Sequence, residues 1–231
     1  MAEVAVEKKE PVFAFGKKER KLLTDPLNDN NPITVQVLGI CSALAVTTLL
    51  IPSIVISVAV IFVCAFSNLI TSLLRNHIPK QVRMIVQLVI IATLVTVVEL
   101  TLKALDYTVY KQLSVYIGLI ITNCIVMGRL EAFAMANTPW KSFLDGVGNG
   151  VGYGVILIAV AFFRELFGKG SLFGFKILGP TDEYLLNTSG SWLLGWYQNN
   201  NLMVLPASAM FLIAIFIWVH RAWNTKLVDV S

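Results

Sequence analysis

The stretch Val35-Gln-Val-Leu-Gly-Ile-Cys-Ser-Ala-Leu-Ala-Val-Thr47 decides how the rest of the chain is interpreted. It is apolar, but it is short for a transmembrane helix, which needs about 20 mainly apolar residues. Gly39 and Cys41 lie near its middle. A similar stretch at 117–128 carries Cys124 near the middle of the chain. The question is whether the two cysteines are packing residues or two halves of one site.

The composition is typical of a protein that crosses a membrane several times. The 231 residues are 56% apolar and 14% charged, whereas soluble domains have about 25% charged residues. The mean hydropathy is +0.74. The net charge of +4 comes from basic residues beside apolar segments. Such residues orient a protein in the membrane, and we expect no nucleic-acid partner. The polar start of the chain is not that of a cleavable signal peptide.

The predicted fold is all-α and polytopic, with six transmembrane segments. A polar, basic arm at 1–31 precedes a membrane domain at 32–223 and a tail at 224–231. Part of the arm is expected to be a surface helix or a flexible tail, and Asn31 and Pro32 favour a helix start. We expect the first and fourth segments to be short or broken. The six segments are 33–50, 54–74, 82–102, 112–127, 143–167 and 202–218.

The orientation follows from the distribution of lysine and arginine. Six spans place both termini on one side, and the basic residues are more frequent in the arm, the tail and the loops of that side. The positive-inside rule therefore predicts that both termini are cytoplasmic. The long loop at 168–201, with Trp192 and Trp196, then faces outward, against the membrane surface or a partner.

The two halves of the membrane domain, about 32–102 and 112–221, match weakly. In each half the cysteine is followed by a proline, a long apolar span and an arginine. Two successive halves of three spans each are inserted with opposite orientation. Inverted repeats with broken helices at matching positions indicate a site near the bilayer midplane. The matching residues are Pro52 and Arg75 in the first half, and Pro139 and Arg164 in the second.

The depth of the cysteines agrees with such a site. Cys41 is nine residues after Pro32, and Cys124 is twelve residues after Gln112. At ~1.5 Å per residue these separations are about 13 and 18 Å along a helix. Since half of the hydrocarbon core is about 15 Å thick, both cysteines can reach the midplane, from opposite faces.

Two interpretations of the cysteines remain open at this point. A cysteine in an apolar helix is usually a small packing residue. The symmetric placement of Cys41 and Cys124 instead favours a metal site, because thiolates prefer iron–sulfur clusters, copper(I) or zinc. A [2Fe–2S] cluster normally takes four thiolates, so another subunit would have to supply two of them. Cys64 has no counterpart in the second half and is interpreted as packing.

Other polar residues in the predicted spans are candidates for function by default. Most of them lie within a turn or two of an interface, where snorkelling or pairing at a helix end is an equally good interpretation. Arg129 and Glu131 are expected at the cytoplasmic surface, paired with each other or with a partner. We predict no catalytic residue. The residues near an interface are Glu99, Asp145, Arg164 and Glu165.

A series of alternating glycines follows Asp145. The series is not a nucleotide-binding loop, because no strand precedes it and no Gly-Lys-Ser/Thr follows it. Small residues at four-residue spacing let helices approach closely in lipid, which favours tight packing over an unwound helix start that exposes carbonyls to a cation. One helical face carries Gly146, Gly150 and Gly154, and another carries Gly148 and Gly152.

Several motifs between about residues 30 and 218 resemble those of a known family. They are Asn30-Asn-Pro-Ile33, Leu38-Gly-Ile-Cys-Ser-Ala-Leu-Ala-Val-Thr47, Ser72-Leu-Leu-Arg-Asn-His-Ile-Pro79, Ile121-Thr-Asn-Cys-Ile-Val-Met-Gly-Arg-Leu-Glu-Ala-Phe-Ala134, Asp145-Gly-Val-Gly-Asn-Gly-Val-Gly-Tyr-Gly154 and Phe163-Arg-Glu-Leu166. The chain resembles the D subunits of the sodium-translocating NADH:quinone oxidoreductases (Nqr). The related E subunits of the Rnf complex usually have proline after the first motif cysteine, where this chain has Ser42.

The resemblance implies a multi-pass subunit of the bacterial inner membrane. In that family the homologous D and E subunits have opposite orientations and share an intramembrane [2Fe–2S] cluster, to which each gives two cysteines. The matching positions are Cys41 and Cys124, as metal and cofactor ligands. The complex, with its A, B, C and F subunits, passes electrons from NADH through flavins to ubiquinone and exports sodium. NADH, flavins and ubiquinone are bound by those other subunits.

Three alternatives are retained beside this expectation. The first is an Rnf-type electron-transport subunit. The second is a secondary cation transporter, in which the broken helices bind the substrate directly and the cysteines are incidental. The third is a structural scaffold without a cofactor.

Overall fold

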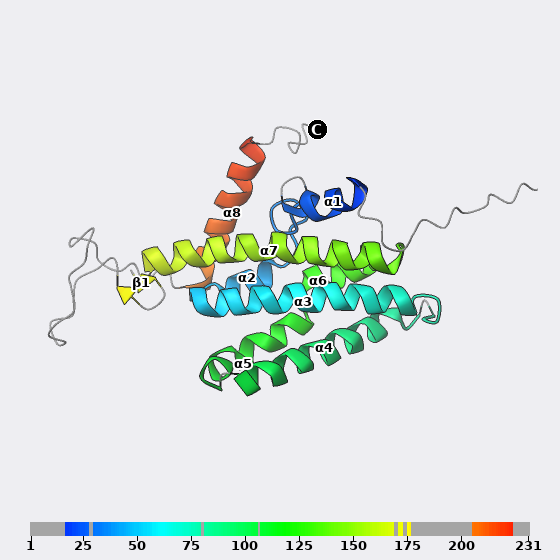
Figure 1. The fold of residues 1–231 in the computed structure, drawn as a ribbon. Coiled ribbons are helices and arrows are strands. Elements are labelled where there is room, and N and C mark those ends of the chain that lie inside the picture. Colours follow the sequence, from blue (N-terminus) through cyan, green and yellow to red (C-terminus); the bar gives the residue numbers. More distant parts are fainter. Residues whose placement is uncertain are drawn as a thin grey trace, which may run out of the picture.

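The computed structural model describes residues 17–27, 30–79, 81–105, 107–168, 171–172, 175–176 and 205–223, and these are almost entirely helical (Figure 1). The strands that it describes are β1 (Ser171–Leu172) and β2 (Phe175–Lys176), an antiparallel pair after α7. The start of the arm, the C-terminal tail and the part of the 168–201 loop with Trp192 and Trp196 lie outside the described residues.

The long helices agree with five of the six predicted spans. Each of the five is long and apolar enough to cross a membrane, so the chain is a multi-pass membrane protein. They are α3 (Leu50–Leu74), α4 (Arg83–Leu105), the interrupted stretch Leu113–Ala134, α7 (Pro139–Gly168) and α8 (Pro206–Trp223).

The predicted span at 33–50 is not a continuous helix. Before α3 begins at Leu50, its helix is limited to the seven-residue α2 (Ile40–Val46). Asn31 does accept hydrogen bonds, from the N–H groups of Ile33 at 3.0 Å and Thr34 at 3.3 Å, but the structure that follows is a local turn. Val37 and Gly39 then have φ angles of 58° and 81°. Such left-handed residues interrupt a right-handed helix, so the helix start predicted at Pro32 is wrong, and regular helix begins after Gly39.

The fourth predicted span is also interrupted, as its sequence indicates. Helix α5 (Tyr107–Ile121) ends at Thr122 and Asn123, and α6 (Cys124–Arg129) follows. The π-helical turn η2 (Leu130–Ala134) completes the stretch. The first and fourth segments therefore both contain a break directly before a short helix.

Two long helices begin earlier than predicted, because a proline lies in their first turn. Helix α3 starts at Leu50, with Pro52 as its third residue, and α7 starts at Pro139 itself. The N–H groups of the first turn have no partner within the helix, so a proline costs nothing there. The predicted starts at 54 and 143 are therefore four residues too late.

Helices α3 and α7 pack side by side along their length and form the centre of the molecule (Figure 1). One glycine face of α7 makes this contact. A Cβ atom added to Gly146 would lie 2.8 Å from the Cα of Ala65, and one added to Gly150 would lie 2.9 Å from the Cα of Ile61. The prediction of tight packing is confirmed. The alternative of an unwound helix start is wrong, because α7 is continuous from Pro139.

The second glycine face of α7 packs against the N-terminal segment. This segment consists of α1 (Lys17–Thr24) and the 3-10 turn η1 (Asp25–Leu27), so part of the arm is helical. A Cβ atom on Gly148 would lie 2.8 Å from the carbonyl oxygen of Leu22, and one on Gly152 would lie 2.5 Å from that of Pro26. The alternating glycines thus allow two backbones to approach α7 at once.

The remaining helices flank this centre. Helix α4 packs against α3 and α5, and α8 packs against α2 and α7. Both leave large apolar side chains exposed, among them Leu100 of α4 and Phe211 of α8, at 62% and 73% exposure. Such surfaces suit lipid or another membrane subunit.

Candidate metal centre at two broken helices

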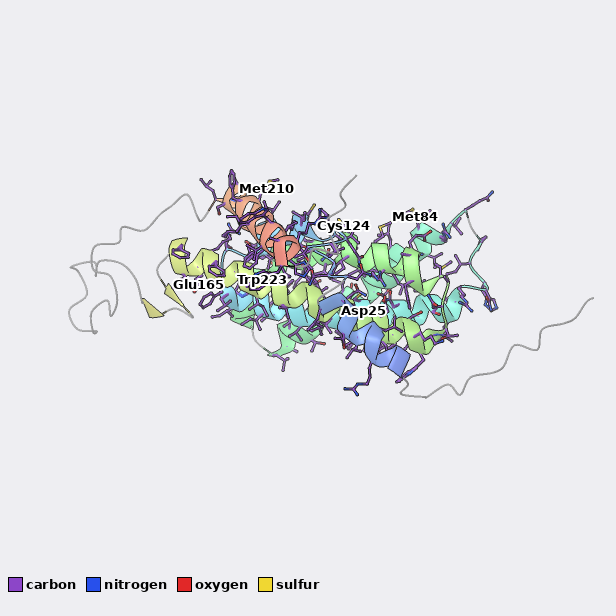
Figure 2. All side chains as sticks on the ribbon, turned by 90° about the horizontal axis from the view of Figure 1, so that it is seen from above. Asp25, Met84, Cys124, Glu165, Met210 and Trp223 are labelled. Carbon is purple, nitrogen blue, oxygen red and sulfur yellow. The ribbon has the colours of Figure 1, made fainter. Side chains whose placement is uncertain are left out.

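Cys41 and Cys124 occupy equivalent positions in two short helices. Cys41 is the second residue of α2, after the left-handed Gly39, and Cys124 is the first residue of α6. Asn123 caps α6, and its Oδ1 atom accepts the N–H of Ile125 at 3.4 Å. Both cysteines are exposed. Cys124 lies near the middle of the bundle, between Glu165 towards one end and Met84 towards the other (Figure 2).

The two breaks in the chain lie next to each other. A Cβ atom on Gly39 would lie 3.6 Å from the Oδ1 of Asn123, and one on Gly128 would lie 3.2 Å from the side chain of Leu38. Tyr153 of α7 contacts the same place, because the Cβ on Gly39 would lie 2.9 Å from its ring. The tertiary structure thus brings together the starts of two helices that are far apart in the sequence.

The donor set fits a thiolate-bound metal that is shared with another chain. Two exposed thiols follow the adjoining breaks, and thiolates are the ligands that iron–sulfur clusters use. No group of three or more Cys, His, Asp and Glu residues able to hold a metal ion exists within the described part of the chain. A [2Fe–2S] cluster at Cys41 and Cys124 would need two further thiolates, and Cys64 is the one other cysteine of the sequence. Cys64 is fully buried and packs in the core, as predicted.

Comparison with known proteins identifies the family. A family model described as "Rnf-Nqr subunit, membrane protein" matches residues 20–217. The chain belongs to the Rnf-Nqr family.

Individual members of the Rnf-Nqr family match over nearly the whole chain. A protein of Photobacterium profundum is 59% identical over 217 residues, which cover 94% of this chain and 99% of that protein. One of Shewanella halifaxensis is 54% identical with the same coverage. One of another Shewanella species is 55% identical over 213 residues, or 92% and 97%. All three are named as the D subunit of Na(+)-translocating NADH-quinone reductase.

Arg164 and Glu165 secure the joint between α2 and α3. A guanidinium N–H of Arg164 donates to Thr47 Oγ1 at 2.6 Å and to the carbonyl of Leu44 at 3.3 Å, at the end of α2. The carboxylate of Glu165 accepts the N–H of Leu50, the first residue of α3, at 2.6 Å. Both residues are at most 3% exposed. Pairing at helix ends is therefore the correct interpretation, and snorkelling is wrong.

A similar arrangement holds the joint between η2 and α7. Near the end of α3, the Ser72 hydroxyl and the Arg75 guanidinium each donate to the carbonyl of Asn137 at 2.7 Å. Side chains from the last turns of α3 thus fix the residues after η2, as Arg164 near the end of α7 fixes the end of α2.

Of the two arrangements expected for Arg129 and Glu131, pairing with each other is wrong. Arg129, at the end of α6, forms an ion pair with the buried Asp145 of α7, with its Nε 2.9 Å from the carboxylate. Glu131 lies in the π-helical turn and pairs instead with Arg83 of α4. Residues two apart in a helix do not face each other, so the two side chains point to different neighbours. Glu99 accepts a hydrogen bond from Tyr110 at 3.0 Å, so it too has a local partner.

Proposed function

We propose that this chain is the D-type membrane subunit of a sodium-translocating NADH:ubiquinone reductase and holds half of a [2Fe–2S] cluster. Cys41 and Cys124 would be its two ligands. The observation that carries the proposal is that two exposed cysteines follow two breaks whose residues Gly39 and Asn123 are neighbours. The names of the relatives in Photobacterium and Shewanella give the type of complex.

Two cysteines are too few for a [2Fe–2S] cluster, so the site would lie at an interface with another subunit. The homologous E subunit would supply two further cysteines, and the A, B, C and F subunits would bind NADH, flavins and ubiquinone. The bound cluster would supply one-electron transfer. The residues of this chain would provide two thiolates and an apolar surround, since α2 and α6 both pack beside the central helix α3. A low dielectric and limited access of water adjust the potential of such a site.

An inverted repeat of two three-span halves would account for the two cysteine helices starting beside each other. We infer that α2, α3 and α4 correspond to α6, α7 and α8. The joint after each short helix supports this, because Arg164 reaches back to α2 while Arg75 reaches the residues that follow η2. Five regular helices cross the membrane by length, and the stretch from α1 through α2 would then make the remaining crossing, at the start of the first half. Both termini would lie on the cytoplasmic side of the bacterial inner membrane, as the basic residues predict.

The test is to replace each cysteine in the purified complex. We expect Cys41→Ser and Cys124→Ser each to abolish the EPR signal of the cluster, to lower the iron content and to block electron transfer from NADH to ubiquinone. Cys64→Ser is the matched control, because Cys64 is a packing residue of the core and should keep the cluster. If both ligand variants keep their iron and their electron transfer, the proposal is wrong, and a cation transporter with incidental cysteines becomes the better interpretation.

A further inference from the structure

Tyr153 is a fully buried tyrosine in the glycine-rich part of α7. A buried phenol hydroxyl needs a hydrogen-bond partner. Here the Tyr153 Oη atom lies 2.7 Å from the Oγ atom of Ser42, the residue directly after Cys41. The Ser42 hydroxyl also lies 2.9 Å from the carbonyl oxygen of Gly39, to which it can donate. The pair of hydroxyls therefore attaches the first turn of α2 to the central helix α7.

The same tyrosine packs against Gly39, which also adjoins the start of the second cysteine helix. A Cβ atom on Gly39 would lie 2.9 Å from the Tyr153 ring and 3.6 Å from the Oδ1 of Asn123, and Asn123 is the cap of α6, directly before Cys124. The ring of Tyr153 packs against Gly39, where any larger side chain would collide with it. Tyr153 thus bonds to the residue after Cys41, and it packs against Gly39 beside the residue before Cys124.

We propose that Tyr153 is a positioning residue that holds Cys41 and Cys124 at a fixed separation. Helices α2 and α6 have only seven and six residues. Isolated helices shorter than about 12 residues are only marginally stable, so contacts with the rest of the protein must fix the positions of α2 and α6. Helix α7 is a continuous support of 30 residues. The identity of the bound group rests on the proposed function, whereas the proposal that Tyr153 positions the two thiols does not.

Loss of the hydroxyl should change the site without removing its ligands. Residues that contact the ligands of a metal orient those ligands. Hydrogen bonds to the sulfur atoms also contribute to the reduction potential of an iron–sulfur cluster. In Tyr153→Phe the ring still fills its space beside Gly39, but the link to Ser42 is lost. We expect this variant to retain iron and to show a shifted midpoint potential and an altered EPR line shape.

The experiment uses the purified complete complex. EPR-monitored redox titration measures the potential, and alkylation of Cys41 and Cys124 after removal of iron measures their positions. We expect the alkylation rates to change roughly 2- to 10-fold in Tyr153→Phe, as expected from the loss of one buried hydrogen bond. Tyr116→Phe is the control, because Tyr116 packs partly buried against the core on α5. It should change neither quantity.

Ser42→Ala removes the other partner of the same hydrogen bond. If the bond is the cause, the double variant with Tyr153→Phe should show no larger shift than either single variant. Ser42→Ala also carries the test if Tyr153→Phe does not assemble. Additive shifts, or unchanged potential and alkylation rates in both single variants, would overturn the positioning role.

The two proposals fail in different ways. A complex without a Cys41-dependent cluster signal contradicts the proposed function, while the alkylation rates still test Tyr153. A complex with that signal intact, in which Tyr153→Phe changes nothing, contradicts only the positioning role.

Discussion

At the scale of single residues, Glu165 shows how a buried carboxylate can be structural. Its oxygen accepts the N–H of Leu50 at 2.6 Å, and the residue is 3% exposed. The first N–H groups of a helix have no partner within it and carry partial positive charge. Glu165 therefore fixes the start of α3 and, with Arg164, the end of α2.

We expect Glu165→Ala to lower the stability of the complex. The substitution leaves the N–H of Leu50 buried without an acceptor, at a cost of about 1–3 kcal/mol. Thermal unfolding of the detergent-solubilised complex measures the loss. Glu165→Gln keeps an acceptor oxygen of similar reach and serves as the control, with a smaller loss. Equal melting temperatures for Glu165→Ala and the unchanged protein would contradict this role.

At the scale of elements, the contact between α3 and α7 depends on the absence of side chains. Cβ atoms on Gly146 and Gly150 would approach the backbone of α3 at 2.8 and 2.9 Å. Backbone at that distance cannot move aside as a flexible side chain can. The two helices would have to separate, and the packing along their length would change.

We therefore expect Gly150→Ala to destabilise the protein by about 1–3 kcal/mol, the usual cost of overpacking a core. Gly118→Ala is the matched control, because a Cβ atom there meets nothing within 4 Å. Since alanine favours a helix over glycine by up to about 1 kcal/mol, this control should be neutral or stabilising. Melting temperatures of the two variants in detergent give the comparison, and a Gly150→Ala variant as stable as Gly118→Ala would refute the packing argument.

At the scale of the whole molecule, the first apolar stretch determines the number of crossings. Five helices are long enough to cross the membrane. In the first half of the chain, the turns at 30–38 and α2 precede the long helices α3 and α4. If this stretch completes a crossing together with α1, the two termini lie on one side. If it does not, five spans leave them on opposite sides.

We expect both termini to be cytoplasmic. Green fluorescent protein fused to the C-terminus should then fluoresce, since it does not fold after export in unfolded form. A cysteine introduced as Ala2→Cys should resist a membrane-impermeant maleimide in intact cells and react in inverted vesicles. Termini on opposite sides of the membrane would exclude six crossings and, with them, the inverted repeat.

Much of the molecule follows from local chemistry and needs no tertiary information. The apolar runs, the prolines and the glycine spacing of α7 predict long helices and tight packing, because length, propensity and side-chain size act within one segment. The break in the first segment is also visible in the sequence, although its position is not. Gly39 takes a left-handed angle where it packs against Tyr153 and Asn123, two residues that are distant in the sequence.

The proximity of the two cysteine helices is visible only in the tertiary structure. Nothing in the sequence near Ser42 indicates Tyr153 as its partner, although a single tyrosine among glycines is a signal that a buried hydroxyl needs a partner. The pairing of Arg129 with Asp145 instead of Glu131 has the same origin. By itself the sequence determined a multi-pass helical membrane protein with two interrupted cysteine segments. Only the packing of α7 against α3 and the N-terminal segment decided that these interruptions meet, because contacts between distant segments depend on how whole helices fit together.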